Sequence, residues 1–205
     1  MKRHLNKRLS EYKIIILDMD GTLYYQIPLR FCMFFELMLY YIFHFSRINE
    51  LFMLYKFRKS YDKGFIEQEN YVIKYWMQEK PLKYISLFRD KKLLRLMGDL
   101  QKGGAKIAIY SDYPVKQKIK SFPDFSVKYF FCASDEIIQC LKPDPKGLKN
   151  ILYKFGEKAE NCLFIGDRYE KDGKCAEDAG TDYIILDKIP FMRNISLYRK
   201  KKDYF

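Results

Sequence analysis

Two aspartates stand two positions apart, directly after a run of four aliphatic residues. Asp18 and Asp20 follow Ile14–Leu17 and precede Gly21 and Thr22. Carboxylates at this spacing on an extended chain project to the same side. Because two close anions repel, the pKa of one carboxyl group rises or the pair binds a cation. A glycine after the pair permits a sharp exit from the strand. The pair alone indicates a cation site, and surface aspartates that cap a strand are the alternative interpretation.

Two further segments offer groups that could bind an anion. Ser111 and Asp112 follow the apolar run Lys106–Tyr110, and a hydroxyl with exposed backbone N–H groups there could bind phosphoryl oxygens. Lys142 lies in the sequence Leu-Lys-Pro-Asp-Pro, which opens a predicted helix, and could offset negative charge at a shared anion site. Taken singly, the serine is also consistent with a helix cap and the lysine with a solvated side chain.

An acidic loop completes the set of polar segments. Asp167, Glu170 and Asp172 follow the apolar run that ends at Ile165. Hard oxygen ligands in this number suit Mg²⁺, which keeps several of its waters. An acidic loop that caps the next helix is the alternative interpretation.

The elements that must position these residues alternate between strand and helix. Such alternation predicts an α/β fold, a doubly wound, Rossmann-like parallel sheet, whose strand ends meet at the edge where such folds bind ligands. The apolar runs predict five buried strands: Lys13–Leu17, Lys106–Tyr110, Val127–Cys132, Asn161–Ile165 and Tyr183–Leu186. Helical patterns are found at Asp90–Gln101, which Gly103 and Gly104 end, and at Val115–Ser121, Lys146–Phe155 and Cys175–Ala179.

The interval between the first two strands is far longer than a crossover needs. About 88 residues separate them, whereas a dozen or so suffice. The interval contains long helical patterns and no convincing strand, so residues 25–86 are predicted to form a small all-helical cap inserted into a core of residues 1–24 and 87–205. Its expected helices are Pro28–Ser46, Asn49–Tyr61 and Ile66–Glu79, the last ended by Pro81.

With these four segments in this order, the chain resembles the haloacid dehalogenase superfamily of phosphohydrolases. The resemblance covers roughly Ile14–Asp20 and Asp90–Leu186, with the four family motifs in order. It implies that Asp18 is phosphorylated during catalysis, and that Asp20 is the general acid/base and offers its backbone carbonyl to Mg²⁺. The insertion lies where one class of the family carries a mobile cap.

The resemblance also implies roles for the later motifs. Ser111 matches the hydroxyl that binds the phosphoryl group, and Lys142 matches the lysine that steadies it. Asp167 is similar to the direct metal ligand, with Asp172 in support through water. Asp112 departs from the asparagine of many relatives, although its backbone can still serve the phosphate.

Together these residues predict a Mg²⁺-dependent phosphatase that hydrolyses a phosphomonoester through an aspartyl-phosphate intermediate. The expected catalytic set is Asp18, Asp20, Ser111 and Lys142, with Asp18, Asp20, Asp167 and Asp172 at the metal. Gly21, Thr22 and Asp112 are expected to bind the substrate, and Lys63, between two cap helices, to reach it from the cap. A phosphosugar mutase with the same nucleophile and a non-catalytic phosphate- or metal-binding protein remain alternatives.

Composition and charge limit the classes of partner and cofactor that the sequence predicts. The net charge of +12 is concentrated in residues 1–13 and 188–205, which leaves about +3 for the rest of the chain, so a nucleic-acid groove is not expected. Five cysteines without a C-x-x-C pair, and only two histidines, speak against zinc and favour free thiols in a reducing cytoplasm.

One segment of the predicted cap is unusually apolar. Phe31–Phe45 is interrupted by Glu36 and His44 alone, and its 15 residues are fewer than the ~20 that a membrane span needs. The pattern predicts a helix buried in the cap, or one that meets a lipid-like substrate, a membrane surface or a dimer partner. His44 is expected to pack within the cap.

Overall fold

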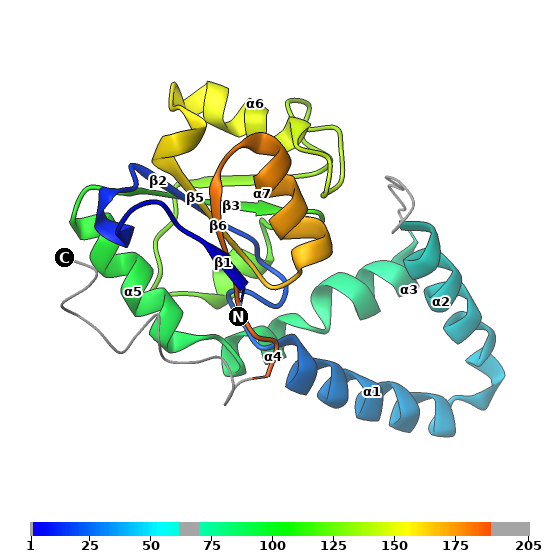
Figure 1. Cartoon of the computed structure of the whole chain (residues 1–205). Coiled ribbons are helices and arrows are strands. Elements are labelled where there is room, and N and C mark those ends of the chain that lie inside the picture. The colour runs from blue at the N-terminus through cyan, green and yellow to red at the C-terminus, as the bar shows by residue number, and fades with distance from the viewer. Residues whose placement is uncertain (1, 62–69, 190–205) are drawn as a thin grey trace.

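A six-stranded sheet forms the centre of the molecule (Figure 1). The structure is a computed structural model that describes residues 2–61 and 70–189. The strand order is β1-β6-β5-β2-β3-β4, and all neighbours run parallel except β1, which is antiparallel to β6. The strands are β1 (Lys2–His4), β2 (Ile14–Leu17), β3 (Lys106–Ser111), β4 (Tyr129–Cys132), β5 (Cys162–Gly166) and β6 (Asp182–Ile185). The five predicted strands are therefore confirmed as the parallel part of a Rossmann-like α/β sheet.

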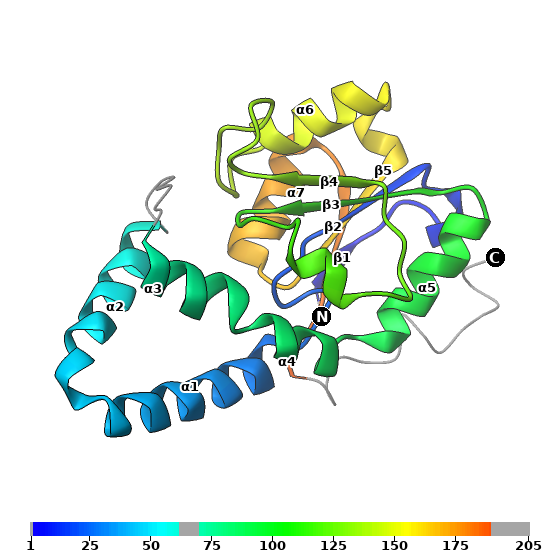
Figure 2. The same ribbon diagram turned by 180° about the vertical axis from the view of Figure 1, so that it is seen from behind.

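Helices cover both faces of this sheet, as Figures 1 and 2 show. Alternate residues of β2 divide between two apolar clusters. Ile15 and Leu17 pack with α5 (Lys91–Lys102), and Ile14 and Ile16 pack with α6 (Lys146–Phe155) and α7 (Lys174–Ala179). Such runs, apolar on both faces, are typical of parallel strands buried beneath helices.

The predicted and observed helices differ at two places. Val115–Ser121 forms only the 3₁₀ turn η4 (Lys118–Ser121), because Pro123 disfavours a helical conformation for the residue before it. The third cap helix ends at Glu79, before Pro81, as expected. Pro81 is in addition the N-cap of a further helix, α4 (Leu82–Leu87), a location that proline tolerates because an N–H there has no helical acceptor.

Between residues 26 and 87, the described part of the insertion is almost entirely helical. It contains α1 (Gln26–Phe43), the 3₁₀ turn η2 (Phe45–Arg47), α2 (Asn49–Tyr61), α3 (Tyr71–Ile73), the π-helical η3 (Lys74–Glu79) and α4. In Figures 1 and 2, α1 and α2 extend away from the sheet, and α3 with η3 returns toward the strand ends.

The two connections between this helical segment and the sheet run side by side. Tyr25 N donates to Phe88 O at 2.8 Å, and Asp90 N donates to Leu23 O at 2.9 Å. The Asp90 side chain then accepts hydrogen bonds from the first N–H groups of α5, which is the usual geometry of an N-cap. The paired connections join the helices directly to the loop that follows Asp20.

Candidate active site

Asp18 lies immediately beyond β2, where three strands end at the same level. Leu17 pairs with Ile109 of β3 and with Ile165 of β5, so the register brings the residues after all three strands together. The Asp18 carboxylate is buried, and it accepts hydrogen bonds from Lys142 Nζ at 2.5 Å and from Thr22 Oγ1 at 3.2 Å. Burial and the neighbouring carboxylates raise the pKa of Asp18 well above its usual value, although Lys142 opposes them.

Lys142 is a fully buried ammonium group between two carboxylates. Its Nζ lies 2.5 Å from Asp18 Oδ1 and 2.7 Å from Asp172 Oδ1. Burial lowers the pKa of Lys142, but the two carboxylates outweigh burial and hold the pKa well above its usual value. The side chain is therefore a permanent positive charge at the centre of the site.

Asp18, Asp167 and Asp172 form a buried cluster whose carboxylate oxygens all lie within 4.8 Å of one another. Asp172 Oδ2 accepts the backbone N–H groups of Asp167 and Arg168 at 3.1 and 3.0 Å. Asp167 Oδ1 is buried and accepts no hydrogen bond from the described residues.

This donor set fits a hard divalent cation. Three buried carboxylates face one buried ammonium group, and burial together with Asp172 raises the pKa of Asp167 to about 6. An oxygen-only site with an unused carboxylate oxygen suits Mg²⁺. Gly21, at φ +96°, lets the loop pass so close that a side chain on it would overlap the Asp167 carboxylate.

Asp20 is separated from this cluster by its own partners. Both of its carboxylate oxygens contact Lys118 Nζ, at 2.7 and 2.6 Å, and one also accepts the Tyr24 O–H. Burial raises the pKa of Asp20, but Lys118 and Tyr24 outweigh burial, so that the net pKa is lowered. The expected metal contact of Asp20 through its backbone carbonyl stays a prediction.

Ser111 and Asp112 lie at the end of β3, as the sequence suggests. The buried Ser111 Oγ accepts the Tyr113 N–H at 3.2 Å, which leaves its hydroxyl proton to donate elsewhere. Asp112 accepts Lys142 N at 3.0 Å and Lys171 Nζ at 3.2 Å. The carboxylate of Asp112 thus holds the Lys142 loop and the Asp172 loop together.

Sequence reasoning missed several side chains that surround Asp20. A cavity of about 180 Å³ opens beside it and is lined by Lys118 and Arg168 from the core and by Arg30 and Arg58 from the helical segment. No motif marks these cations, because the fold of the loops and helices brings them together. The predicted substrate contact Lys63 lies outside the described residues.

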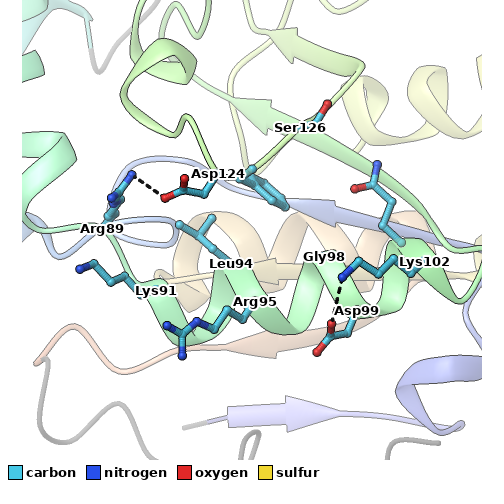
Figure 3. A pocket seen from close by; sticks show the side chains of 11 residues that line it. Arg89, Lys91, Leu94, Arg95, Gly98, Asp99, Lys102, Asp124 and Ser126 are labelled. Carbon is cyan, nitrogen blue, oxygen red and sulfur yellow. Dashed lines mark ion pairs between the residues drawn. The ribbon is translucent and has the colours of Figure 1, made fainter.

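A larger groove of about 780 Å³ runs along α5, shown in Figure 3. Four of its charged side chains form two ion pairs, Arg89 with Asp124 at 3.4 Å and Lys102 with Asp99 at 3.9 Å. None of the carboxylates at the strand ends lines this groove. The smaller cavity beside Asp20 is therefore the better candidate for a substrate site.

The sequence matches the family of haloacid dehalogenase-like hydrolases over residues 15–186. The chain belongs to this family. A comparison with curated protein sequences gives no match.

Solved structures of haloacid dehalogenase-like proteins share the fold at low sequence identity. A phosphatase of the family from Thermococcus onnurineus is 19% identical, with a TM-score of 0.64 over 85% of this chain and 86% of its own. A 2-haloacid dehalogenase from Pseudomonas syringae is 16% identical, with a TM-score of 0.63 over 92% and 91%. CbbY from Rhodobacter sphaeroides, in complex with xylulose-(1,5)bisphosphate, is 12% identical, with a TM-score of 0.61 over 93% and 92%. Because these neighbours differ in activity, the fold alone does not select the reaction.

Proposed function

We propose that this hydrolase is a Mg²⁺-dependent phosphatase that cleaves a phosphomonoester through Asp18. The observation that carries the proposal is the separation of two nearby aspartates into different surroundings. Asp18 lies against Lys142 beside two further carboxylates, whereas Asp20 is held by Lys118 and Tyr24. Neighbouring carboxylates with different surroundings suit a nucleophile and an acid/base.

In the first step, an Asp18 oxygen attacks phosphorus and the bond from phosphorus to the leaving oxygen breaks. Asp20, in its protonated form, gives its proton to that oxygen, so the product leaves as a neutral alcohol. In this mechanism the Lys142 ammonium and the Ser111 hydroxyl bind the phosphoryl oxygens, and the loop at Gly21 and Thr22 contributes to substrate binding.

In the second step, water attacks the phosphorus of the aspartyl phosphate. Asp20, now a carboxylate, accepts a proton from that water, and the bond from phosphorus to the Asp18 oxygen breaks to release phosphate. Bound Mg²⁺, held by Asp18, Asp167 and Asp172, would neutralise charge on the phosphoryl group. Lys142, which lies 2.5 Å from Asp18 and 2.7 Å from Asp172, orients both carboxylates.

Asp20 favours phosphoryl transfer over dehalogenation. Release of a halide needs no proton donor, whereas release of an alkoxide does. Asp20 is a buried carboxylate near the proposed nucleophile, and Tyr24 and Lys118 hold its orientation. Such a group has a role in phosphoryl transfer and none in dehalogenation.

The proposal is tested by phosphate release from a panel of sugar phosphates, phosphorylated hydroxy acids and nucleotides, with Mg²⁺ and with EDTA. We expect Mg²⁺-dependent turnover that Asp18→Asn abolishes while its thermal unfolding stays cooperative. Asp99→Asn, at an exposed position of α5 where the side chain pairs with Lys102, is the matched control. Turnover by Asp18→Asn contradicts the proposal, and isomer formation without free phosphate indicates a mutase.

A further inference from the structure

The cavity beside Asp20 is lined by positive side chains from two parts of the fold. Lys118 and Arg168 come from loops at the strand ends, and Arg30 and Arg58 come from α1 and α2. The remaining lining is provided by Tyr24, Gln26, Leu29, Met77, Pro81 and Tyr113. A volume of about 180 Å³ leaves space for a small molecule next to the proposed acid/base.

The cations on the two sides differ in their partners. Lys118 is paired with Asp20, and Arg168 lies within 4.0 Å of Asp112. In the part of the chain that the structure describes, neither Arg30 nor Arg58 has a carboxylate within ion-pairing distance. Burial and the charge of Arg58 lower the pKa of Arg30. Among the described residues, the side of the cavity formed by α1 and α2 therefore holds excess positive charge that an anion would neutralise.

We propose that Arg30 and Arg58 bind a second anionic group of the substrate, a carboxylate or a further phosphate, while the scissile phosphate lies at Asp18. This inference rests on the proposed phosphatase function and specifies its substrate class. A guanidinium group offers two parallel donors that match either anion. The substrate is thus a small phosphomonoester with a second anionic group, rather than a sugar or alcohol phosphate whose only anionic group is the scissile phosphate.

Matched substrate pairs test this assignment. Glycerol 3-phosphate is compared with 3-phosphoglycerate, and propanediol monophosphate with propanediol bisphosphate, so that the second anion is a carboxylate in one pair and a phosphate in the other. We expect kcat/KM to be about 10- to 100-fold higher for the member with the second anion, as charge-assisted hydrogen bonds imply. The pair with the larger ratio identifies the anion.

Arg30→Gln and Arg58→Gln should each reduce this ratio toward one. Arg95→Gln, an exposed arginine on α5, should preserve it. A wild-type ratio of one in both pairs overturns the assignment even if phosphate is released. If no phosphate is released, calorimetric titration of the same pairs decides. Tighter binding of the member with the second anionic group, lost in Arg30→Gln, supports the site, and equal binding of both members refutes it.

A second inference rests on the outer face of α1, which carries an uninterrupted apolar stripe. Six side chains spaced three and four residues apart are between 46% and 62% exposed: Phe31, Phe34, Phe35, Met38, Leu39 and Ile42. In Figures 1 and 2, α1 lies at the outer edge of the molecule. The prediction of a helix buried in the cap is thus correct for only one face. An exposed patch of this kind marks an interaction surface.

The opposite face of α1 anchors the helix to its neighbours. Leu29, Met33 and Tyr41 are buried, and Glu36 pairs with Lys80 at 3.4 Å and with Lys83. Among the described residues α1 is the one helix long and apolar enough to cross a membrane. Because one face is packed and ion-paired, α1 fits a position in the plane of a membrane surface better than a span.

Exposed charge next to the stripe is positive. On α2, the exposed Phe52 and Tyr55 are accompanied by the exposed Lys56 and Lys59. Of the acidic residues on α1 and α2, Glu36 pairs with lysines and Glu50 pairs with Arg47 at 2.7 Å. A face of aromatic side chains next to lysines complements anionic lipid, whereas a second copy would bring the same positive charges.

We infer that the outer faces of α1 and α2 dock on an anionic lipid surface. Flotation with phosphatidylcholine vesicles, with and without phosphatidylglycerol, tests this. We expect binding that requires the anionic lipid and that falls at least about tenfold in Phe35→Ser and in Phe31→Ser. Tyr153→Ser, which removes an exposed aromatic side chain on α6, should bind as the wild type does.

Light scattering with the same variants tests the alternative, in which a second copy of this chain covers the apolar stripe. Absence of flotation overturns the inference, and a stable dimer that Phe35→Ser dissociates then assigns the face to a second copy. Flotation unchanged by both phenylalanine substitutions also overturns it, because the lipid contact would lie elsewhere.

Discussion

Lys118 contacts both carboxylate oxygens of Asp20, at 2.7 and 2.6 Å, from a residue 98 positions away in the sequence. The short 3₁₀ turn η4 presents the lysine, and the loop after β2 presents the aspartate. The contact lowers the pKa of Asp20 and so favours its ionised form. An anionic substrate that draws Lys118 away would raise the pKa of Asp20 and favour the protonated acid that the first step requires.

Lys118→Gln tests this relationship through the pH profile. Lys118 lowers the pKa of Asp20, so removal of its charge raises that pKa and Asp20 stays protonated to higher pH. The limb of the kcat profile that reports loss of the Asp20 proton should move to higher pH. Lys120→Gln, two positions along the same turn and exposed, should leave the profile in place. An unshifted limb in Lys118→Gln would contradict the role of this pair.

Lys142→Met is expected to destabilise the fold. The substitution leaves Asp18 and Asp172 buried without their cation, and removal of one partner of a buried ion pair costs about 3–5 kcal/mol. Urea unfolding in EDTA measures the loss. Lys146→Met, exposed at the start of α6, should change the free energy of unfolding by less than about 0.5 kcal/mol. A Lys142→Met protein of wild-type stability would show that the cluster needs no cation.

Mg²⁺ is expected to stabilise the protein through Asp167. At a Mg²⁺ concentration of 100 times the dissociation constant, binding adds about 2.7 kcal/mol to the free energy of unfolding, which thermal unfolding detects as a rise in Tm. Asp167→Asn removes a charged ligand from the cluster and should abolish most of this rise. Asp124→Asn, exposed and distant from the cluster, should retain it. An equal rise in both variants would place the ion elsewhere.

Much of the sheet and of the buried cluster could be predicted because both depend on local pattern. Runs such as Ile14–Leu17 are apolar on both faces, and the polar residues that follow them must meet at one edge of a parallel sheet. Strand β1 escaped prediction because its three residues, Lys2–His4, are polar. It joins the sheet by antiparallel pairing with β6, and Asp182 at the start of β6 accepts hydrogen bonds from Asn6 and Tyr12, which follow β1 in the chain.

The surroundings of Asp20 could not be predicted for a related reason. Lys118, Arg30 and Arg58 belong to three different elements, and no spacing along the chain shows that they share a cavity. The exposure of the apolar stripe on α1 is likewise a tertiary property. Composition identified the segment, but only the packing of Leu29 and Met33 determines which face is covered.

Gly21→Ala tests how closely the first loop must approach the metal cluster. Gly21 adopts φ +96°, and a methyl group there would overlap the Asp167 carboxylate. The strain of a left-handed conformation, about 1–2 kcal/mol, and the displacement of Asp167 should both weaken Mg²⁺ binding, so that turnover falls at least about tenfold and the Mg²⁺-induced rise in Tm shrinks.

Gly98→Ala is the matched control, because Gly98 lies in α5 with open space at the position of the new methyl group. There alanine should stabilise the helix by about 0.5–1 kcal/mol and leave turnover unchanged. Equal behaviour of the two variants would show that Asp167 does not depend on the approach of Gly21.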